Sequence, residues 1–266
     1  MAAVSAAGPA DRPTLVLLHA LPLDASSWDQ VARALRAQGH PVLAHDQLGF
    51  GSAPPTDGLP PSLDTAADEL AAELDRRGLR SVVLAGCSMG GYLAMAFLRR
   101  HPGRVAALAL LAARATADDP AAAARRRRFA ELVLDDRARD LLVAETTPAL
   151  LGATTRVRRP ELVERVTELA LAARPASVAW AQRAIADRAD ALDTLRATDV
   201  PAVVLVGDED ELVTLDEAGQ AVAALPRGRL VILPGVGHLA PLEAPEAVVD
   251  TLGHLLTRQA HAEATP

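Results

Sequence analysis

The pentapeptide Gly86-Cys-Ser-Met-Gly90 has the residue types and spacing of a catalytic serine turn. The apolar run before Gly86 predicts a short strand, and the run after Gly90 predicts a helix that ends before Pro102. A serine in such a strained turn needs neighbours two residues away that lack side chains. We expect Ser88 to be exposed beside helix N-terminal N–H groups, Met89's first, where an oxyanion would form. The alternative is a glycine-rich turn with a passenger serine.

A serine nucleophile also needs a histidine base and an orienting acid, placed in loops after later strands. His238 follows the strand-like run 229–233 in a glycine-rich loop, downstream of an acidic run that follows the strand-like run 202–206. His19 also ends a strand but precedes the serine, so we expect it to organise its own loop. The acidic run consists of Asp208, Glu209, Asp210 and Glu211. Periodicity does not decide which of these four adjacent acids orients the histidine, and such a charge run is usually a solvated loop.

Cys87 is the rival nucleophile in the same turn. Its position points it into the sheet, which favours a small buried filler. Because it is the single cysteine of the chain, an intramolecular disulfide and a cysteine-built zinc site are both excluded. We expect no metal and no cofactor.

Composition narrows the function further. The 266 residues are 50% hydrophobic, carry a net charge of −7 and include no apolar run long enough to span a bilayer. Arginine supplies all 27 positive charges, so the chain lacks the lysine of a P-loop, a Schiff-base enzyme or a Ser-Lys dyad. The acidic balance argues against a nucleic-acid partner.

Residues 1–9 lack signal-peptide features and predict a frayed start. We expect a cytoplasmic monomer or homodimer that acts on a small molecule, without a membrane partner.

The catalytic residues require a sheet to position them, and the hydrophobic pattern predicts one. Strand-like and helix-like runs alternate up to about residue 113 and resume at about 200, and six strands are countable. We predict a doubly wound, mainly parallel α/β sheet with the run 41–45 at its edge. Residues 114–199 show only helical periods, broken by prolines, and predict a helical cap of roughly four helices. The predicted domains are therefore a core of 1–113 and 200–266 and a cap of 114–199.

Over nearly its whole length the chain resembles the α/β-hydrolase fold family. The resemblance rests on His19-Ala20-Leu21, on the glycine turn 46–51, on the serine turn, on Gly207-Asp-Glu-Asp210 and on Gly235-Val-Gly-His238 with its tail. The family's fold commonly begins with an antiparallel pair of strands, and because only 13 residues precede the first predicted strand here, we expect these N-terminal strands to be reduced or absent. The resemblance selects Asp210 as the acid. It also implies an oxyanion hole from the backbone N–H groups of Leu21 and Met89. Ala20 stands where the family usually has glycine, which requires a negative φ there.

The resemblance implies a serine hydrolase with the triad Ser88, His238 and Asp210, acting on a small or medium carboxylic ester, thioester or lactone through an acyl-enzyme. Within this family, the chain is most similar to the small bacterial esterase, perhydrolase and enol-lactonase group. A C–C bond hydrolase or lyase on the same triad and a non-catalytic binding protein are the alternatives. The arginine run 125–128 could bind an anion, but its residues fan around a helix, so at most one or two could face the site. Three aromatic residues could line the pocket or the core: Trp28, Phe129 and Trp180.

Overall fold

A six-stranded parallel sheet forms the centre of the computed structural model, which describes residues 13–263, with side chains as far as Gln259. The strand order is β2-β1-β3-β4-β5-β6, and every neighbouring pair is parallel. This confirms the predicted fold class and places the short β2 at the edge. The strands are β1 (Thr14–Leu18), β2 (Val42–His45), β3 (Val82–Cys87), β4 (Val105–Leu111), β5 (Ala202–Gly207) and β6 (Gly228–Leu233).

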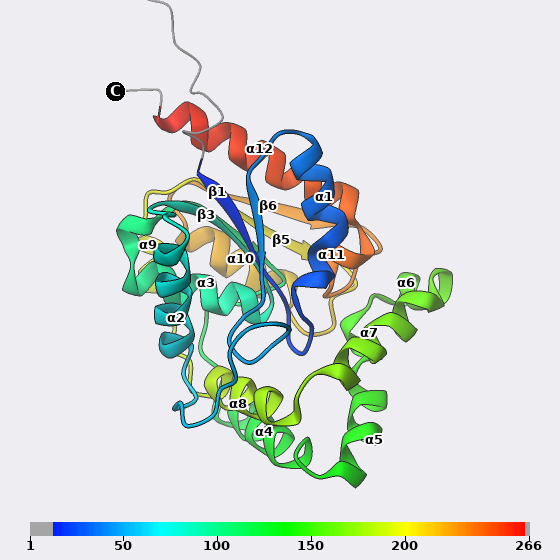
Figure 1. Ribbon diagram of the computed structural model, residues 1–266. Helices are drawn as coiled ribbons and strands as arrows, with labels where there is room; N and C mark the ends of the chain where they lie inside the picture. The colour runs from blue at the N-terminus through cyan, green and yellow to red at the C-terminus, as the bar shows by residue number, and fades with distance from the viewer. Residues whose placement is uncertain (1–12, 264–266) are drawn as a thin grey trace, which may run out of the picture.

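Helices cover both faces of the sheet (Figure 1). Side chains alternate along β1, so that Val16 joins the hydrophobic cluster on one face and Leu17 joins the cluster on the other. The first face packs against α2 (Leu63–Arg76), α3 (Met89–Arg100) and α10 (Leu215–Ala224). The second packs against α1 (Asp29–Ala37), α11 (Ala240–Glu243) and α12 (Pro245–Glu263). Short 3-10 turns lie at η2 (Ala25–Trp28), η3 (Pro102–Arg104) and η4 (Pro148–Leu150).

The segment between β4 and β5 contains helices and no strand. Most of it lies at one end of the sheet, where Figure 1 draws it in green, whereas its last helix, α9 (Leu192–Arg196), packs against α3 and α10. The segment holds six α-helices rather than the expected four, because two of them are too short to show a helical period. They are α4 (Pro120–Leu132), α5 (Asp136–Thr146), α6 (Ala153–Arg158), α7 (Pro160–Ala172), α8 (Pro175–Ala186) and α9 (Leu192–Arg196).

This helical insertion shares the hydrophobic core of the sheet. Val178 and Ile185 of α8 belong to the cluster on the first face, and Leu162 of α7 belongs to the cluster on the second. Apolar burial therefore fixes the insertion against the sheet. We retain the division into a core and a cap of 114–199 as a proposal.

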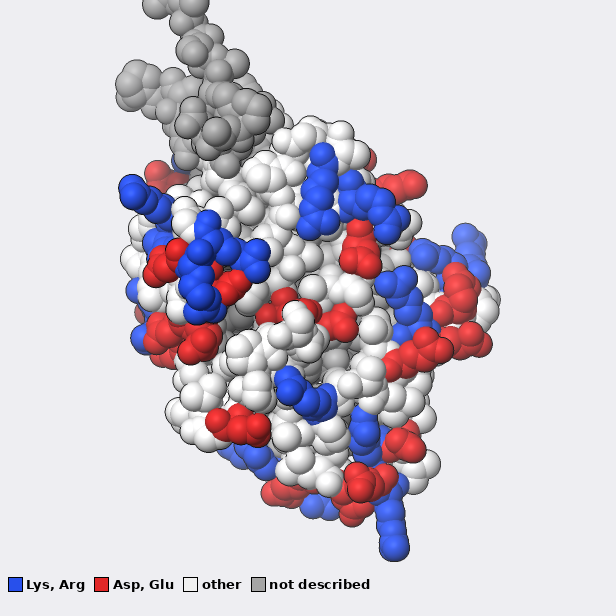
Figure 2. Space-filling model, viewed as in Figure 1, with Lys and Arg blue, Asp and Glu red and all other residues white. Residues whose placement is uncertain are grey.

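Charge is mixed on the outside of the molecule. On the face seen in Figure 2, arginine and acidic side chains are interspersed and do not gather by sign. In the described part of the chain, no helix has the length and apolar character needed to cross a membrane. The frayed start predicted for residues 1–9 lies outside the described residues.

Candidate active site

Ser88 joins β3 to α3 in a strained turn. Its φ of 53° and ψ of −114° lie outside the regions that side chains usually allow, and its N–H donates to the Leu111 carbonyl at 2.8 Å. A Cβ at Gly86 would lie 2.1 Å from the Gly90 carbonyl oxygen, and a Cβ at Gly90 would lie 2.2 Å from the Leu18 carbonyl oxygen. Both glycines are therefore required by close backbone approach, as predicted.

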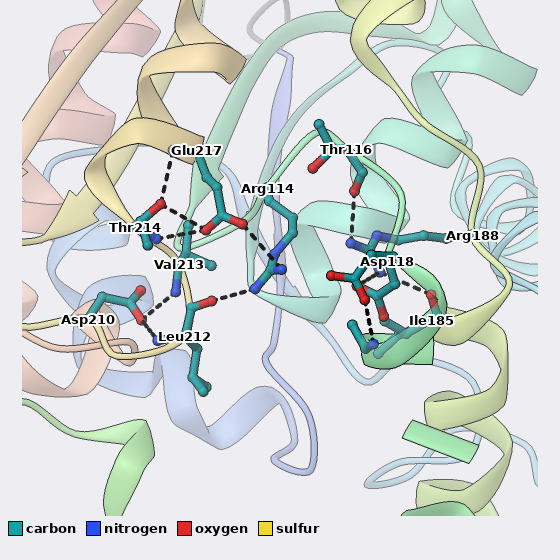
Figure 3. Close-up of polar contacts among 12 residues, drawn as sticks. Arg114, Thr116, Asp118, Ile185, Arg188, Asp210, Leu212, Val213, Thr214 and Glu217 are labelled. Carbon is teal, nitrogen blue, oxygen red and sulfur yellow. Dashed lines mark hydrogen bonds and ion pairs between the residues drawn. The ribbon is translucent and has the colours of Figure 1, made fainter. Parts of the chain in front are cut away.

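The structure brings His238 and Asp210 together. The Nδ1 atom of His238 lies 3.0 and 2.9 Å from the two carboxylate oxygens of Asp210. Asp210 Oδ1 also accepts hydrogen bonds from the backbone N–H groups of Leu212 at 2.8 Å and Val213 at 3.0 Å (Figure 3). Both side chains of the pair are buried, with 3% and 0% exposed. An acceptor at Nδ1 places the imidazole proton there and leaves Nε2 free to accept one.

The four adjacent acids of this loop each have a different partner. Asp208 accepts from the Gly235 N–H at 2.7 Å, and Glu209 accepts from the Thr154 N–H and hydroxyl at 2.7 and 2.6 Å. Glu211 pairs with Arg156 at 2.8 Å. Of the four, Asp210 contacts the histidine, as the resemblance implied.

The buried carboxylate of Glu243, which belongs to the tail of the histidine motif but had no predicted role, holds the histidine loop. Glu243 Oε2 accepts from the Gly237 N–H at 3.0 Å, and Oε1 accepts from the Leu239 N–H at 3.0 Å. The same Oε2 accepts from the Gly152 N–H of the insertion at 2.9 Å. Glu243 therefore fixes the backbone on both sides of His238 and connects it to the insertion.

Arg114 is a second residue that sequence reasoning missed. It follows β4, between the strands that carry the serine and the acid, and its guanidinium donates to the Leu212 carbonyl at 2.5 Å. It also pairs with Glu217 of α10 at 3.2 Å (Figure 3). Because the Leu212 N–H binds Asp210, Arg114 supports the loop that holds the acid.

The two backbone N–H groups expected to bind an oxyanion have no competing acceptor. Within residues 13–263, neither the Leu21 N–H nor the Met89 N–H donates to another group. Leu21 and Ser88 both line the same cavity, and Met89 begins α3. Ala20 does not have a positive φ, so its methyl group is tolerated as expected, and it is buried against the second face of the sheet.

His19 organises the loop that precedes Leu21. Its Nε2 accepts from the Gln47 N–H at 3.0 Å, so Nδ1 carries the proton toward the Ala20 carbonyl, also 3.0 Å away. Burial lowers the pKa of His19 to about 4, against a smaller raising effect of the hydrogen bond to Ala20. This neutral histidine confirms the predicted local role.

Cys87 has the environment of a structural thiol. It belongs to the cluster on the second face of the sheet, and its Sγ donates to the His238 carbonyl at 3.5 Å. Burial, followed by the charges of Asp210 and Glu243, raises its pKa well above the ordinary thiol range. A thiol that stays protonated is a poor nucleophile, as the sequence led us to expect.

Ser88 and His238 line a cavity of about 390 Å³ between the carboxyl ends of the strands and the insertion. Phe129 of α4 lines it too, whereas Trp28 is wholly in the core and Trp180 donates to the Leu59 carbonyl at 3.0 Å. Of the arginine run 125–128, Arg126 alone lines the cavity. Within the described residues, no group of three or more His, Cys, Asp or Glu side chains could hold a metal ion.

Comparisons with known proteins agree on one family. A family model described as alpha/beta hydrolase fold matches residues 13–245. The chain is 32% identical over 250 residues to pimeloyl-[acyl-carrier protein] methyl ester esterase of Aromatoleum aromaticum, covering 89% of this chain and 95% of that protein. It is 29% identical over 235 residues to a non-heme haloperoxidase of Rhodococcus erythropolis, covering 83% of each chain.

A solved structure of a thermophilic esterase from Thermogutta terrifontis, with malate bound, is 34% identical with a TM-score of 0.89, covering 93% of this chain and 90% of that one. The enol-lactonase of Burkholderia xenovorans, 24% identical with a TM-score of 0.83, shares the fold and covers 93% of this chain and 92% of its own.

Proposed function

Because the chain belongs to the alpha/beta hydrolase fold family, we propose that it is a serine hydrolase acting on a small or medium carboxylic ester, thioester or lactone. One observation carries the proposal. The buried Asp210–His238 pair lies beside the cavity that Ser88 also lines, and Ser88 holds the strained backbone of a nucleophile turn. Relatives named as esterases support the reaction class.

In the proposed mechanism, His238 Nε2 takes the hydroxyl proton as Ser88 Oγ bonds to the carbonyl carbon. Asp210 orients the imidazole and stabilises its charged form. The Leu21 and Met89 N–H groups bind the oxyanion, and losing one such donor typically costs about 100- to 1000-fold in rate. His238 returns the proton to the departing alcohol, thiol or lactone oxygen, and water then cleaves the serine ester by the same steps. The reaction uses neither a metal nor a cofactor.

We also propose that the protein is cytoplasmic and acts on small molecules as a monomer or homodimer, without nucleic acid or membrane. The single, buried cysteine supports a reducing compartment, and the net charge of −7 argues against a nucleic-acid partner.

Fluorophosphonate labelling with a panel of p-nitrophenyl esters and lactones tests the proposal. We expect wild type to label and to hydrolyse esters, and Ser88→Ala to lose labelling and at least about 10³-fold in kcat. Ser81→Ala, an exposed serine before β3, is the matched control and should behave as wild type. A wild-type protein that neither labels nor turns over any ester or lactone would favour a binding role.

A further inference from the structure

Two helices of the insertion each present one polar residue to an otherwise apolar stretch of the cavity wall. On α4, Arg126 is followed at helical spacing by Phe129 and, just after the last residue of the helix, by Val133, and all three line the cavity. On α8, Gln182 lies between Val178 and Ile185 at the same kind of spacing. The two polar side chains meet, because Arg126 Nη1 donates to Gln182 Oε1 at 3.2 Å.

This contact leaves hydrogen-bond donors of both side chains available to the cavity. Since the guanidinium can only donate, the Gln182 oxygen faces Arg126 and its NH₂ group is directed elsewhere. Arg126 Nε is used by Asp118 Oδ2 at 2.6 Å. Among the described residues, neither the Arg126 Nη2 group nor the Gln182 NH₂ group has an acceptor, although both residues line the cavity.

The charge around these donors is positive. The side chain of Asp118 is fully buried and pairs with two cations, Arg126 at 2.6 Å and Arg188 at 2.7 Å. Burial raises the pKa of Asp118, but the two arginines lower it overall, so one negative charge faces two positive ones. Arg188 is occupied elsewhere, donating to the Thr116 and Ile185 carbonyls (Figure 3). The Arg188 side chain is also only 4% exposed and does not line the cavity, whereas Arg126 is 25% exposed and does, so Arg126 is the cation of this cluster that an anion in the cavity can reach.

The rest of the lining has the same sign. Arg139 donates to the carbonyls of Leu171 and Ala173 and has no carboxylate partner within residues 13–263. The lining includes three arginines, of which Arg114 is paired with Glu217, and a single carboxylate, the exposed Glu145. An anion in this cavity would gain both donors and favourable charge in surroundings of low dielectric.

We propose that Arg126 and Gln182 form an anion subsite that binds a substrate carboxylate distant from the scissile bond. The inference rests on the proposed function and names its substrate class: esters that carry a free carboxylate at their far end, preferred over neutral esters of the same length. The subsite is built by α4 and α8 of the insertion, whereas Ser88 lies in the turn between β3 and α3. The rest of the arginine run is exposed, and Arg127 pairs with Asp187 outside the cavity.

The kinetic test compares kcat/KM for monomethyl adipate with that for neutral dimethyl adipate. A third substrate, the acetate ester of 5-hydroxypentanoate, carries the carboxylate on the leaving group and so separates the two possible positions. We expect wild type to favour at least one anionic ester, and Arg126→Gln to lower the anionic-to-neutral ratio on the order of 10- to 100-fold. Arg127→Gln, its neighbour in the run, should leave the ratio unchanged.

Calorimetric titration with adipate tests the subsite without turnover. We expect Arg126→Gln to weaken adipate binding by about tenfold or more. Gln182→Glu should do the same, because the new carboxylate pairs with Arg126 and occupies the anion's place while retaining the contact between α4 and α8. Thermal unfolding of each variant checks that it folds.

The outcomes separate the two proposals. If wild type hydrolyses the neutral ester but Arg126→Gln changes neither the ratio nor adipate binding, the subsite is overturned and the hydrolase stands. If wild type neither reacts with fluorophosphonate nor hydrolyses any ester or lactone, the proposed function fails, and adipate binding by wild type and Arg126→Gln still decides the subsite.

Discussion

Two aspartates, Asp118 and Asp210, have side chains with no exposed surface and yet have opposite surroundings. Asp118 lies between two arginines, which keep their charge at every physiological pH. Asp210 faces His238, whose charge depends on a proton, and two backbone N–H groups. Figure 3 shows both aspartates.

The two aspartates differ in whether the charge of their partners changes: the arginines beside Asp118 stay charged, so we call Asp118 the fixed aspartate, whereas His238 becomes charged only when it is protonated, so we call Asp210 the responsive aspartate. A buried carboxylate between permanent cations is part of a constant electrostatic arrangement, and removing it leaves unpaired buried charge. A carboxylate held by neutral N–H donors is poised to stabilise a cation that forms only during the reaction. Burial alone therefore does not identify a catalytic acid, whereas the kind of partner does.

The largest expected effect falls on the responsive aspartate. Asp210→Asn should lower kcat by roughly 10³- to 10⁴-fold, because the amide no longer holds the imidazole in the required tautomer or balances its charge. Steady-state hydrolysis of a p-nitrophenyl ester measures it. Asp208→Asn, which alters the carboxylate bound to the Gly235 N–H, should retain most of the activity. The reverse order of effects would transfer the acid role to Asp208.

The next effect falls on the fixed aspartate, and on stability. Asp118→Asn should lower the free energy of unfolding by about 3 to 5 kcal/mol, because the largely buried Arg188 then lacks its counter-charge. Urea denaturation measures the loss. Asp193→Asn removes an exposed ion pair with Arg196 and should change nothing measurable. Equal, small losses in both variants would contradict the distinction between the two buried aspartates.

A smaller effect extends the comparison to the histidines at the strand ends. His19 has backbone partners where His238 has a carboxylate, and burial lowers the pKa of His19 from 6.5 to about 4. Between these pH values the unfolded chain binds the proton and the folded chain does not. Unfolding free energy should therefore fall as the pH drops from 6.5 to 4, by up to about 3 kcal/mol from this residue.

Denaturant unfolding at several pH values measures this slope. His19→Gln should flatten it between pH 6.5 and 4, whatever its effect on stability at pH 7. His254→Gln, an exposed histidine on α12, should leave the slope as in wild type. An unchanged slope in His19→Gln would mean that His19 titrates equally in both states.

The sheet and the order of the candidate residues could be predicted because both depend on short stretches of sequence, namely apolar runs and glycine-containing turns. Apolar runs gave the six strands, and a short run with a leading proline gave the edge strand β2. The glycines around Ser88 gave the turn, since close backbone approach leaves room for no other residue. Asp210 came from the resemblance, because four adjacent acids have no distinguishing period.

The roles that were missed, those of Glu243 and Arg114, depend on contacts across long stretches of chain. Glu243 meets Gly152, and Arg114 meets Leu212, through contacts between distant segments that no local pattern encodes. The run 125–128 showed that only one or two arginines could face the site, but identifying Arg126 required the packing of α4 against α8. The short helices α6 and α9 were missed for want of a full period.

The bond from the Gly152 N–H to Glu243 also bears on how such a chain can be recombined. Gly237 and Gly152 approach so closely that a Cβ on Gly237 would lie 2.1 Å from the Gly152 nitrogen. The segment around Gly152 and the histidine loop therefore fit one another closely, and a chimera should take both from the same parent protein. Helices α4 and α5 lie wholly before it, so a chimera that exchanges them and keeps Gly152 with its histidine loop would vary the cavity wall while preserving the catalytic geometry.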